Sequence, residues 1–326
     1  MKILVTGGAG FIGSNVVDAY VAAGHEVIVV DNLSSGKLSN INPKTRFYLL
    51  DIRSNELKKV FEFEKPDIVN YHAAQISVTA SVKDPLFDAD VNIKGFLNLL
   101  ESARLNKTKK LILISSGGAI YGEAEEYPTT EACRPKPLSP YAISKLVTEQ
   151  YLSFYNHCYG LDYTVLRYSN VFGPRQIPNG EAGVVAIFME RLLNNNPCTL
   201  YHFNDETRGM VRDYCFVGDV VRANLLALDK GSMEAFNIGT GVETFTEDLF
   251  AIVYESAKKN MPGISYALER KAAKMGELKR SCLNIEKAKS GLGWQPQICL
   301  SEGIEITMKW WSSEMNRLGI KGYDAA

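Results

Sequence analysis

Residues 3–13 read ILVTGGAGFIG, an apolar run that passes directly into a glycine-rich turn and then into a helical pattern. The glycines fit G-x-x-G-x-x-G from Gly7 and also G-x-G-x-x-G from Gly8. Glycines let the backbone approach a pyrophosphate closely, and the N-terminus of the following helix faces the phosphate charge. The stretch therefore predicts a strand, a dinucleotide-binding turn and a helix. A glycine turn that serves packing alone is the alternative.

The next apolar run, Val27–Val30, leads directly into an acidic residue, Asp31. A carboxylate at this place accepts hydrogen bonds from both hydroxyls of the adenosine ribose and repels a 2′-phosphate. We therefore expect the bound dinucleotide to be NAD rather than NADP.

Short apolar runs alternate with helical patterns through the first half of the chain. The runs are Ile3–Val5, Val27–Val30, Ile68–Tyr71, Leu111–Ile114 and Tyr163–Leu166. They lack polar alternation, which is typical of strands buried on both faces of a parallel sheet. Helical patterns lie between them at about 12–23, 53–63, 86–105 and 141–158. This order predicts an α/β fold with a doubly wound parallel sheet of the Rossmann type.

The pattern changes after Asn170, where residues 173–180 read GPRQIPNG and predict an irregular, turn-rich segment. Beyond it we expect a helix near 182–193, a mixed segment at 198–217 and a helix at 219–229. The sequence thus predicts an NAD-binding Rossmann domain over 1–170. Residues 171–326 are expected to form a smaller mixed α/β substrate-binding lobe, with some segments returning to the sheet.

The composition excludes several classes of function. The chain has 326 residues, of which 46% are hydrophobic, and a formal net charge of −1, which gives no basis for binding nucleic acid or an anionic membrane. No stretch approaches the roughly 20 apolar residues of a membrane span, and the N-terminus does not fit a signal peptide. Six scattered cysteines and four histidines indicate reduced thiols without a metal site. We expect a cytoplasmic protein.

The segment 139–145, SPYAISK, begins a helix with Ser139 as its N-cap and Pro140 in its first turn. Tyr141 and Lys145 are four residues apart and therefore share one helix face. A nearby ammonium and a positive nicotinamide ring would lower the pKa of the phenol and make it a usable base. A surface tyrosine beside a solvated lysine is the alternative. Ser116, at the end of the run that begins at Leu111, could hydrogen-bond a substrate oxygen, and a simple turn is its alternative.

Together these elements resemble the extended short-chain dehydrogenase/reductase family, and within it the UDP-glucose 4-epimerases. The resemblance covers nearly the whole chain. It rests on VTGGAGFIGS at 5–14, DNLSSG at 31–36, HAAQ at 72–75, LRYSNVFGPR at 166–175 and VRDY at 211–214. One departure is Tyr71, which stands where the family usually has histidine.

The resemblance implies a set of site residues. For NAD it implies Gly7, Gly10, Phe11, Ile12, Gly13, Asp31, Asn32, Ser35, Gly36, Asp51, Ile52, Ala73, Ala74, Gln75, Asn92, Tyr141, Lys145 and Tyr168. For a UDP-sugar substrate it implies Ser116, Tyr141, Asn170, Arg212, Glu277 and Ser281. Ser116, Tyr141 and Lys145 would be the catalytic residues.

The activity that the resemblance implies is the reversible inversion of carbon 4 of a UDP-hexose through a 4-keto sugar, with NAD retained. Related dehydratases and decarboxylases carry an acid directly after the catalytic serine or threonine, whereas Gly117 and Gly118 follow Ser116 here. This favours an epimerase. Another NAD-dependent nucleotide-sugar enzyme, such as a 4,6-dehydratase, decarboxylase or reductase, and an NAD-binding regulator without catalysis are the alternatives.

The sequence differs from the family pattern in two segments near the expected nucleotide-binding site. Residues 274–277 read KMGE where the family has R-x-G-D, and 203–210 are longer than its usual turn. Ser281 lies where epimerases restricted to unacetylated sugars have tyrosine, so UDP-N-acetylhexoses are also possible substrates. The resemblance further implies a homodimer formed through the helices at about 86–105 and 141–158, whose apolar residues could equally belong to the core.

Overall fold

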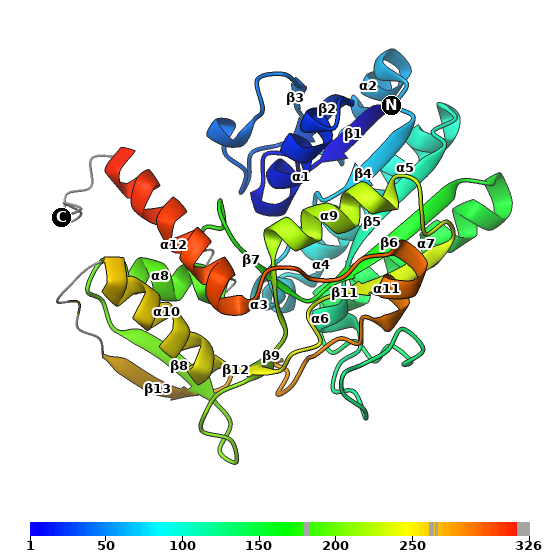
Figure 1. The fold of residues 1–326 in the computed structure, drawn as a ribbon. Helices are drawn as coiled ribbons and strands as arrows, with labels where there is room; N and C mark the ends of the chain where they lie inside the picture. Colours follow the sequence, from blue (N-terminus) through cyan, green and yellow to red (C-terminus); the bar gives the residue numbers. More distant parts are fainter. Residues whose placement is uncertain (179–182, 261–263, 265–266, 275, 318–326) are drawn as a thin grey trace.

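A seven-stranded, fully parallel sheet forms the centre of the molecule (Figure 1). The computed structural model describes the chain except for residues 179–182, 261–263, 265–266, 275 and 318–326. The strand order is β11-β6-β5-β4-β1-β2-β3. The strands are β1 (Lys2–Thr6), β2 (Glu26–Asp31), β3 (Arg46–Leu49), β4 (Ile68–Tyr71), β5 (Lys110–Ser116), β6 (Asp162–Tyr168) and β11 (Glu234–Ile238).

The sheet is buried on both faces because successive strand residues feed two separate cores. Ile3 and Val5 of β1 point into one core, and Leu4 points into the other. Three helices cover the first face: α1 (Phe11–Ala22), α9 (Val217–Ala227) and α11 (Glu286–Leu292). Another three cover the second: α2 (Leu57–Glu64), α5 (Gly95–Leu105) and α7 (Pro140–Tyr159). The predicted doubly wound α/β fold is confirmed.

Two elements of the first half differ from the expected pattern. β3 was not among the apolar runs, because this edge strand is partly exposed along its length. The helical pattern at 86–105 corresponds to α4 (Pro85–Ala89), the π-helical turn η2 (Asp90–Lys94) and α5. The short helix α3 (Val78–Lys83) precedes them, and η1 (Leu38–Asn40) follows β2.

The smaller lobe packs around three two-stranded ladders. These are β7 (Asn170–Phe172) with β10 (Tyr214–Phe216), β8 (Cys198–His202) with β13 (Leu268–Ala272), and β9 (Val211–Arg212) with β12 (Thr244–Phe245). Helices α8 (Val184–Leu193), α10 (Thr246–Asn260) and α12 (Leu300–Arg317) complete it. Phe188, Phe250 and Met308 lie in its core.

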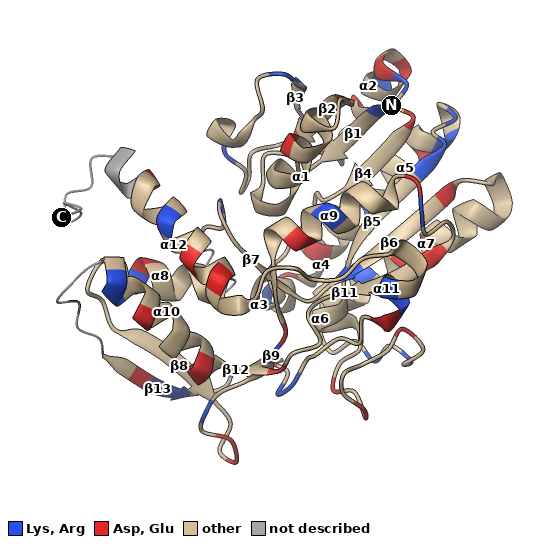
Figure 2. Cartoon of the chain, in the orientation of Figure 1, with Lys and Arg blue, Asp and Glu red and all other residues tan. Residues whose placement is uncertain are grey.

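The chain after residue 170 is not confined to this lobe. β11 pairs in parallel with β6, and α9 and α11 pack on the sheet. Acidic and basic side chains are interspersed over the visible elements (Figure 2). Among the described helices, none combines the length and apolar character that crossing a membrane would require.

Strand order reverses between β1 and β4, which lie side by side although β2 and β3 intervene in sequence. In open parallel sheets this is where a crevice opens at the carboxyl ends of the strands and receives ligands. The glycine turn follows β1, and the segment beginning at His72 follows β4. The fold therefore brings two of the predicted cofactor-binding segments to one crevice.

Candidate active site

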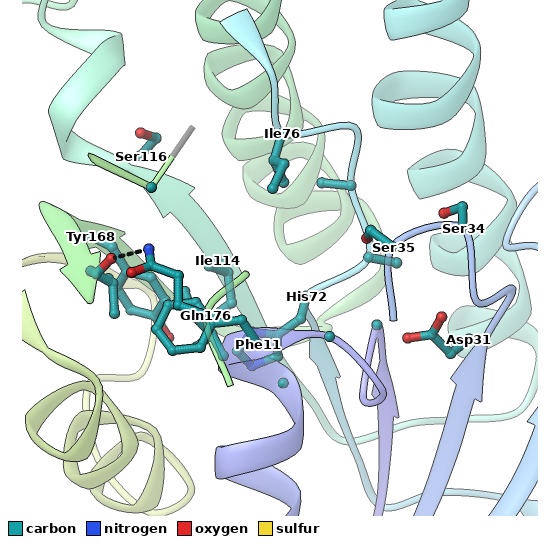
Figure 3. Close-up of a pocket in the computed structure, with 18 of the residues that line it drawn as sticks. Phe11, Asp31, Ser34, Ser35, His72, Ile76, Ile114, Ser116, Tyr168 and Gln176 are labelled. Atoms are coloured by element: carbon teal, nitrogen blue, oxygen red, sulfur yellow. Dashed lines mark hydrogen bonds between the residues drawn. The ribbon is translucent and has the colours of Figure 1, made fainter. Parts of the chain in front are cut away.

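Two cavities meet at the carboxyl edge of the sheet. One, of about 380 Å³, runs along the glycine turn, and the other, of about 500 Å³, lies between the sheet and the lobe. Ser116, Tyr141 and Asn170 line both. Figure 3 shows Asp31 at one end of the first cavity and Ser116 and Tyr168 at the other. Ser116 and Tyr141 therefore lie at the junction, Lys145 lines the first cavity only, and Asp31, the predicted ribose ligand, lies at the far end.

The glycine turn is built by close backbone packing. Gly7 has φ +68°, and a Cβ on Gly13 would lie 2.2 Å from its carbonyl oxygen. A Cβ on Gly10 would meet the same oxygen at 3.2 Å. Gly10 is also the N-cap of α1, and no side chain caps the helix or places an acid in its first turn. Close packing alone would therefore explain why glycine is needed at Gly7 and Gly13. The start of α1, whose backbone N–H groups have no side-chain cap, also suits an anionic ligand.

Asp31 is held in a fixed orientation at the end of β2. Its Oδ2 accepts a hydrogen bond from the Ala9 amide at 3.0 Å, and its Oδ1 accepts one from the Leu33 amide at 2.8 Å. The carboxylate lines the cavity, where a carboxylate can accept hydrogen bonds from vicinal ribose hydroxyls.

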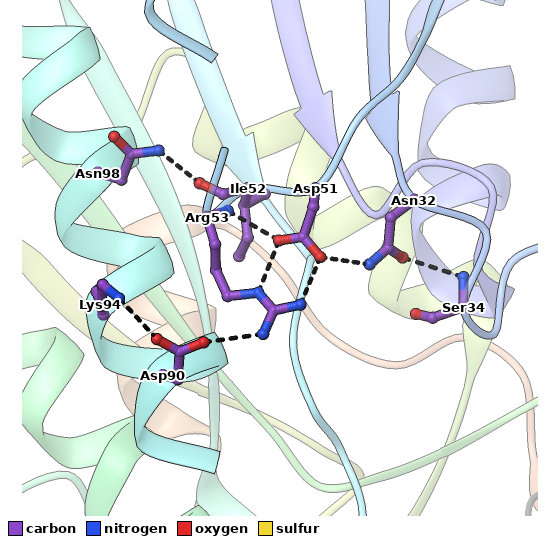
Figure 4. Close-up of polar contacts among 8 residues, drawn as sticks. All are labelled: Asn32, Ser34, Asp51, Ile52, Arg53, Asp90, Lys94 and Asn98. Carbon is purple, nitrogen blue, oxygen red and sulfur yellow. Dashed lines mark hydrogen bonds and ion pairs between the residues drawn. The ribbon is translucent and has the colours of Figure 1, made fainter. Parts of the chain in front are cut away.

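Asp51 belongs to a charged network at the same end of the cavity (Figure 4). Its carboxylate accepts from the Arg53 guanidinium at 2.8–2.9 Å and from the Asn32 amide at 2.9 Å. The guanidinium holds the pKa of Asp51 well below its usual range. Asp90 binds the same guanidinium at 2.8 Å, and Asn98 donates to the Ile52 carbonyl. The predicted pair at 51–52 is therefore rigid and lines the cavity.

Helix α7, which carries Tyr141 and Lys145, begins as its sequence indicates. Ser139 accepts a hydrogen bond from the Ala142 amide at 3.2 Å, and Pro140 lies in the first turn. Tyr141 lines both cavities together with Ser116, whose hydroxyl is close enough to the phenol to lower its pKa. The Lys145 ammonium lies 5.9 Å from the centroid of the Tyr141 ring.

The expected lowering of the Tyr141 pKa depends on a bound nicotinamide ring, and in the protein without cofactor the pKa is not lowered. Burial raises this pKa to about 12, and the Ser116 hydroxyl offsets only part of the rise. Lys145 instead donates to the Ile114 carbonyl at 3.0 Å. Burial lowers the pKa of Lys145 to about 8, although Asp88 and Glu149 act to raise it. The phenol therefore needs further positive charge, such as that of a bound cofactor, to act as a base near pH 7.

The predicted substrate residues gather around the second cavity. Asn170, Arg212 and Glu277 line it, and the Arg212 guanidinium forms an ion pair with Glu277 at 3.2 Å. Ser281 lies behind this wall, and its Oγ is 3.9 Å from the place of a Cβ on Gly118. Met275, in the predicted KMGE segment, lies outside the described residues.

Three predicted cofactor residues do not reach the cavity wall. A Cβ on Gly36 would lie 2.8 Å from the Ala9 Cβ, so this glycine serves packing. The buried Asn92 side chain accepts from the Gln75 amide at 2.9 Å and donates to the Gln75 carbonyl at 3.0 Å. Asn92 and Gln75 therefore act through the turn that carries Ala73 and Ala74, which do line the cavity.

Other wall residues escaped the sequence prediction. The His72 Nε2, Ser169 Oγ and Gln176 Oε1 atoms are buried and have no hydrogen-bond partner within the described part of the chain. Burial lowers the pKa of His72 to about 3, so the ring is neutral at pH 7. The only sequence signal for these three residues was that they lie within or next to the motifs at 72–75 and 166–175. Unpaired buried polar atoms on a cavity wall fit a polar ligand, and with Asp31 and the glycine turn they fit NAD.

No group of three or more histidine, cysteine, aspartate or glutamate side chains that could hold a metal ion occurs among the described residues. The cavities are therefore assigned from their cofactor-type and acid–base side chains.

Comparison with known proteins identifies the family of the chain. Residues 3–239 match the model of the NAD dependent epimerase/dehydratase family, and the chain belongs to that family. It is 42% identical to the UDP-glucose 4-epimerase of Mycolicibacterium smegmatis, over 96% of this chain and 99% of that protein. The crystal structure of Thermotoga maritima UDP-glucose 4-epimerase with UDP-glucose is 48% identical, covering 97% of this chain and 100% of that one, with a TM-score of 0.92.

A further solved structure is the UDP-N-acetylglucosamine 4-epimerase of Methanobrevibacter ruminantium M1 in complex with UDP-N-acetylmuramic acid. It is 32% identical, covers 96% of this chain and 99% of that one, and has a TM-score of 0.88. The NAD dependence of the family agrees with the expected cofactor.

We predict that Lys145→Met stabilises the cofactor-free fold at pH 7. A folded-state pKa of about 8 against the ordinary 10.5 means that keeping the ammonium buried costs roughly 3 kcal/mol at neutral pH. The variant also loses the hydrogen bond to the Ile114 carbonyl, which reduces the expected gain in stability by about 1 kcal/mol. The cost is complete below pH 8 and disappears as the pH rises toward 10.5. Thermal unfolding should therefore show a gain for the variant at pH 7 that shrinks at pH 10.

The exposed Lys109→Met is the matched control, and its effect should not follow this pH course. A Lys145→Met gain that stays constant between pH 7 and pH 10 would contradict the assignment.

Proposed function

We propose that the protein is a UDP-hexose 4-epimerase that interconverts UDP-glucose and UDP-galactose with resident NAD. One observation carries the proposal: Tyr141 and Ser116 both lie where the dinucleotide cavity meets the lobe cavity. A sugar held in the lobe can present its 4-hydroxyl to Tyr141 there, beside a cofactor held along the glycine turn.

The first cavity supplies the residues that would hold NAD. Gly10 and the start of α1 would face the pyrophosphate, Asp31 the adenosine ribose, and Tyr168 and Lys145 the nicotinamide end. Bound NAD supplies a hydride acceptor that returns the hydride within the same turnover, so no net oxidation results.

The protein's own groups manage the proton. Tyr141, as phenolate, takes the proton of the 4-hydroxyl and later gives it back to the same oxygen, while Ser116 keeps a hydrogen bond on that oxygen. Lys145 supplies positive charge that favours the phenolate. The intermediate is a 4-keto sugar, which must present its other face before the hydrogen at carbon 4 is restored.

The lobe cavity fits a nucleoside diphosphate. Arg212, Arg191 and Lys274 place positive charge along it, and the Lys274 ammonium lies 4.7 Å from the centroid of the Tyr201 ring. The Arg212–Glu277 pair keeps that guanidinium in place at 3.2 Å. Positive side chains here suit the two phosphates of a UDP-sugar.

The serine turn argues against the other nucleotide-sugar reactions. Gly117, which follows Ser116, supplies no acidic side chain, and a Cβ there would lie 2.6 Å from the Leu283 side chain. Gly118 lines the lobe cavity and likewise offers none. Dehydration needs an acid beside the catalytic hydroxyl to expel water, which favours epimerisation over a 4,6-dehydratase or decarboxylase.

The proposed location is the cytoplasm, since all six cysteines are free. A role in galactose metabolism follows from the proposed substrates.

The direct test is incubation of the purified protein with UDP-galactose, which should give UDP-glucose. Tyr141→Phe should lower kcat by about 10² to 10⁴ while leaving NAD bound. Tyr163→Phe, whose residue lies away from both cavities, is the matched control. Absence of UDP-glucose from the wild-type reaction, with or without added NAD, would reject the proposed activity, and a fully active Tyr141→Phe would reject its role.

Ser281 is proposed to leave room for an N-acetyl group. Its small buried side chain lies directly behind Gly118, which lines the lobe cavity, and the Methanobrevibacter relative is named for an N-acetylated UDP-sugar. We expect Ser281→Tyr to lower kcat/KM for UDP-N-acetylglucosamine at least about tenfold more than for UDP-glucose, since a bulky group in a packed pocket costs 1–3 kcal/mol. Ser281→Ala is the control, and equal losses on both substrates would remove the idea.

A homodimer is proposed through α3, α4, α5 and α7. These helices expose Val82, Leu86, Phe87, Leu105, Ile143, Phe154 and Tyr159. Exposed apolar side chains gathered on adjacent helices are typical of an interface between copies. Phe154→Asp should therefore give a monomer in sedimentation, whereas Phe63→Asp on α2, where the side chain is 76% exposed against 49% for Phe154, should not. A monomeric wild-type protein would contradict the dimer.

A further inference from the structure

Asp88 of α4 is a fully buried carboxylate that the reaction does not use. Its Oδ1 accepts hydrogen bonds from Gln75 Nε2 and Asn92 Nδ2, both at 2.9 Å. Its Oδ2 accepts one from the Ser144 hydroxyl at 2.6 Å. All three donors are neutral. A buried carboxylate held only by neutral donors costs stability, so its retention calls for a role beyond packing.

The three donors belong to the two sides of the active site. Gln75 ends the turn whose residues Ala73 and Ala74 line the NAD cavity. The Asn92 side chain forms two hydrogen bonds with the backbone of Gln75. Ser144 lies on α7 between Tyr141 and Lys145. One carboxylate therefore joins the cofactor-facing turn to the catalytic helix.

A second bond fixes the same segment to α7. The Tyr141 amide donates to the Ser81 hydroxyl of α3 at 3.1 Å. The first turn of α7 is thus attached to α3 through Ser81, and its second turn to α4 through Asp88. The backbone of the catalytic tyrosine takes its position from these two contacts.

Asp88 also acts on the catalytic pair through its charge. The charged or titratable groups that face Lys145 are Asp88 from α4, Glu149 and Tyr141 from α7, and His72 from the turn after β4. Glu149 is paired with Arg167 at 2.6 Å, whereas Asp88 has no ion pair within the described part of the chain. The negative charge of Asp88 raises the pKa of both Tyr141 and Lys145.

We propose that Asp88 is a positioning residue that locks the NAD-facing turn to the catalytic helix, so that NAD retention and the alignment of Tyr141 depend on one buried carboxylate. This inference rests on the proposed epimerase function.

The test is Asp88→Asn in the full-length protein loaded with NAD. The amide keeps the size of the carboxylate but presents an N–H group to one of three donors. We expect bound NAD to be released at least about fivefold faster on gel filtration, and kcat to fall about tenfold with little change in KM, since a lost hydrogen bond of this kind costs about 1–3 kcal/mol. Both limbs of the kcat–pH profile should move to lower pH, by on the order of half a unit, because the pKa of Tyr141 and of Lys145 both fall.

The matched control is Asp84→Asn, which makes the same change at the exposed start of α4, where Asn also caps a helix. It should leave NAD release and the pH profile unchanged. Ser144→Ala removes the link to α7 but keeps the charge, so kcat should fall with the pH limbs unmoved. An Asp88→Asn protein that matches wild type in NAD release and pH profile would overturn the proposal.

Two further outcomes are decisive. If Asp88→Asn does not fold, Ser144→Ala decides alone, and an unchanged kcat in that variant overturns the proposal. If wild-type protein binds NAD but converts no UDP-hexose, the proposed function fails, while the ratio of NAD release rates still tests Asp88.

Discussion

The hydrogen bond from the Lys145 ammonium to the Ile114 carbonyl, together with one from the Ser115 hydroxyl to Glu149, holds α7 against the end of β5. The same strand ends in Ser116, so these bonds fix the distance between the serine hydroxyl and Tyr141. The bond from Lys145 forms in a buried environment that disfavours the charge of Lys145, and nearby carboxylates offset part of that penalty. Burying the Lys145 ammonium beside the Tyr141 phenol therefore lowers the stability of the fold. Such a cost is common at functional sites, where activity and stability make opposing demands.

The sheet and the glycine turn could be predicted from the sequence because both depend on local signals. Strands such as β1 are apolar at successive positions, and Gly7 and Gly13 are required by backbone contacts within one turn. β3 escaped because its residues are partly exposed and carry no such run. The π-helical turn at 90–94 also escaped, since its helical period differs from that of an α-helix by too little to show in a short pattern.

The sequence predicted the wall of the cavity only for residues that belong to a recognised motif and line the cavity themselves. Asp31 and Tyr141 follow this rule, whereas Asn92 and Gln75 were assigned to the cofactor and instead hold a turn. The pKa of Tyr141 depends on how deeply the fold buries it, which spacing along a helix does not reveal. Likewise, no sequence pattern could show that polar atoms of Ser169 and Gln176 are buried without a protein partner.

The return of β11 to the sheet bears on how this architecture can be modified. The chain leaves the sheet after β6, forms part of the lobe, and comes back to place β11 beside β6. Two connections therefore run next to each other, joined where the Ser169 amide donates to the Ile238 carbonyl at 2.9 Å. A shortened protein ending near residue 170 would leave β6 as an uncovered edge strand. Substrate lobes can be exchanged between such proteins only as inserted segments with both junctions preserved, and not as a terminal module.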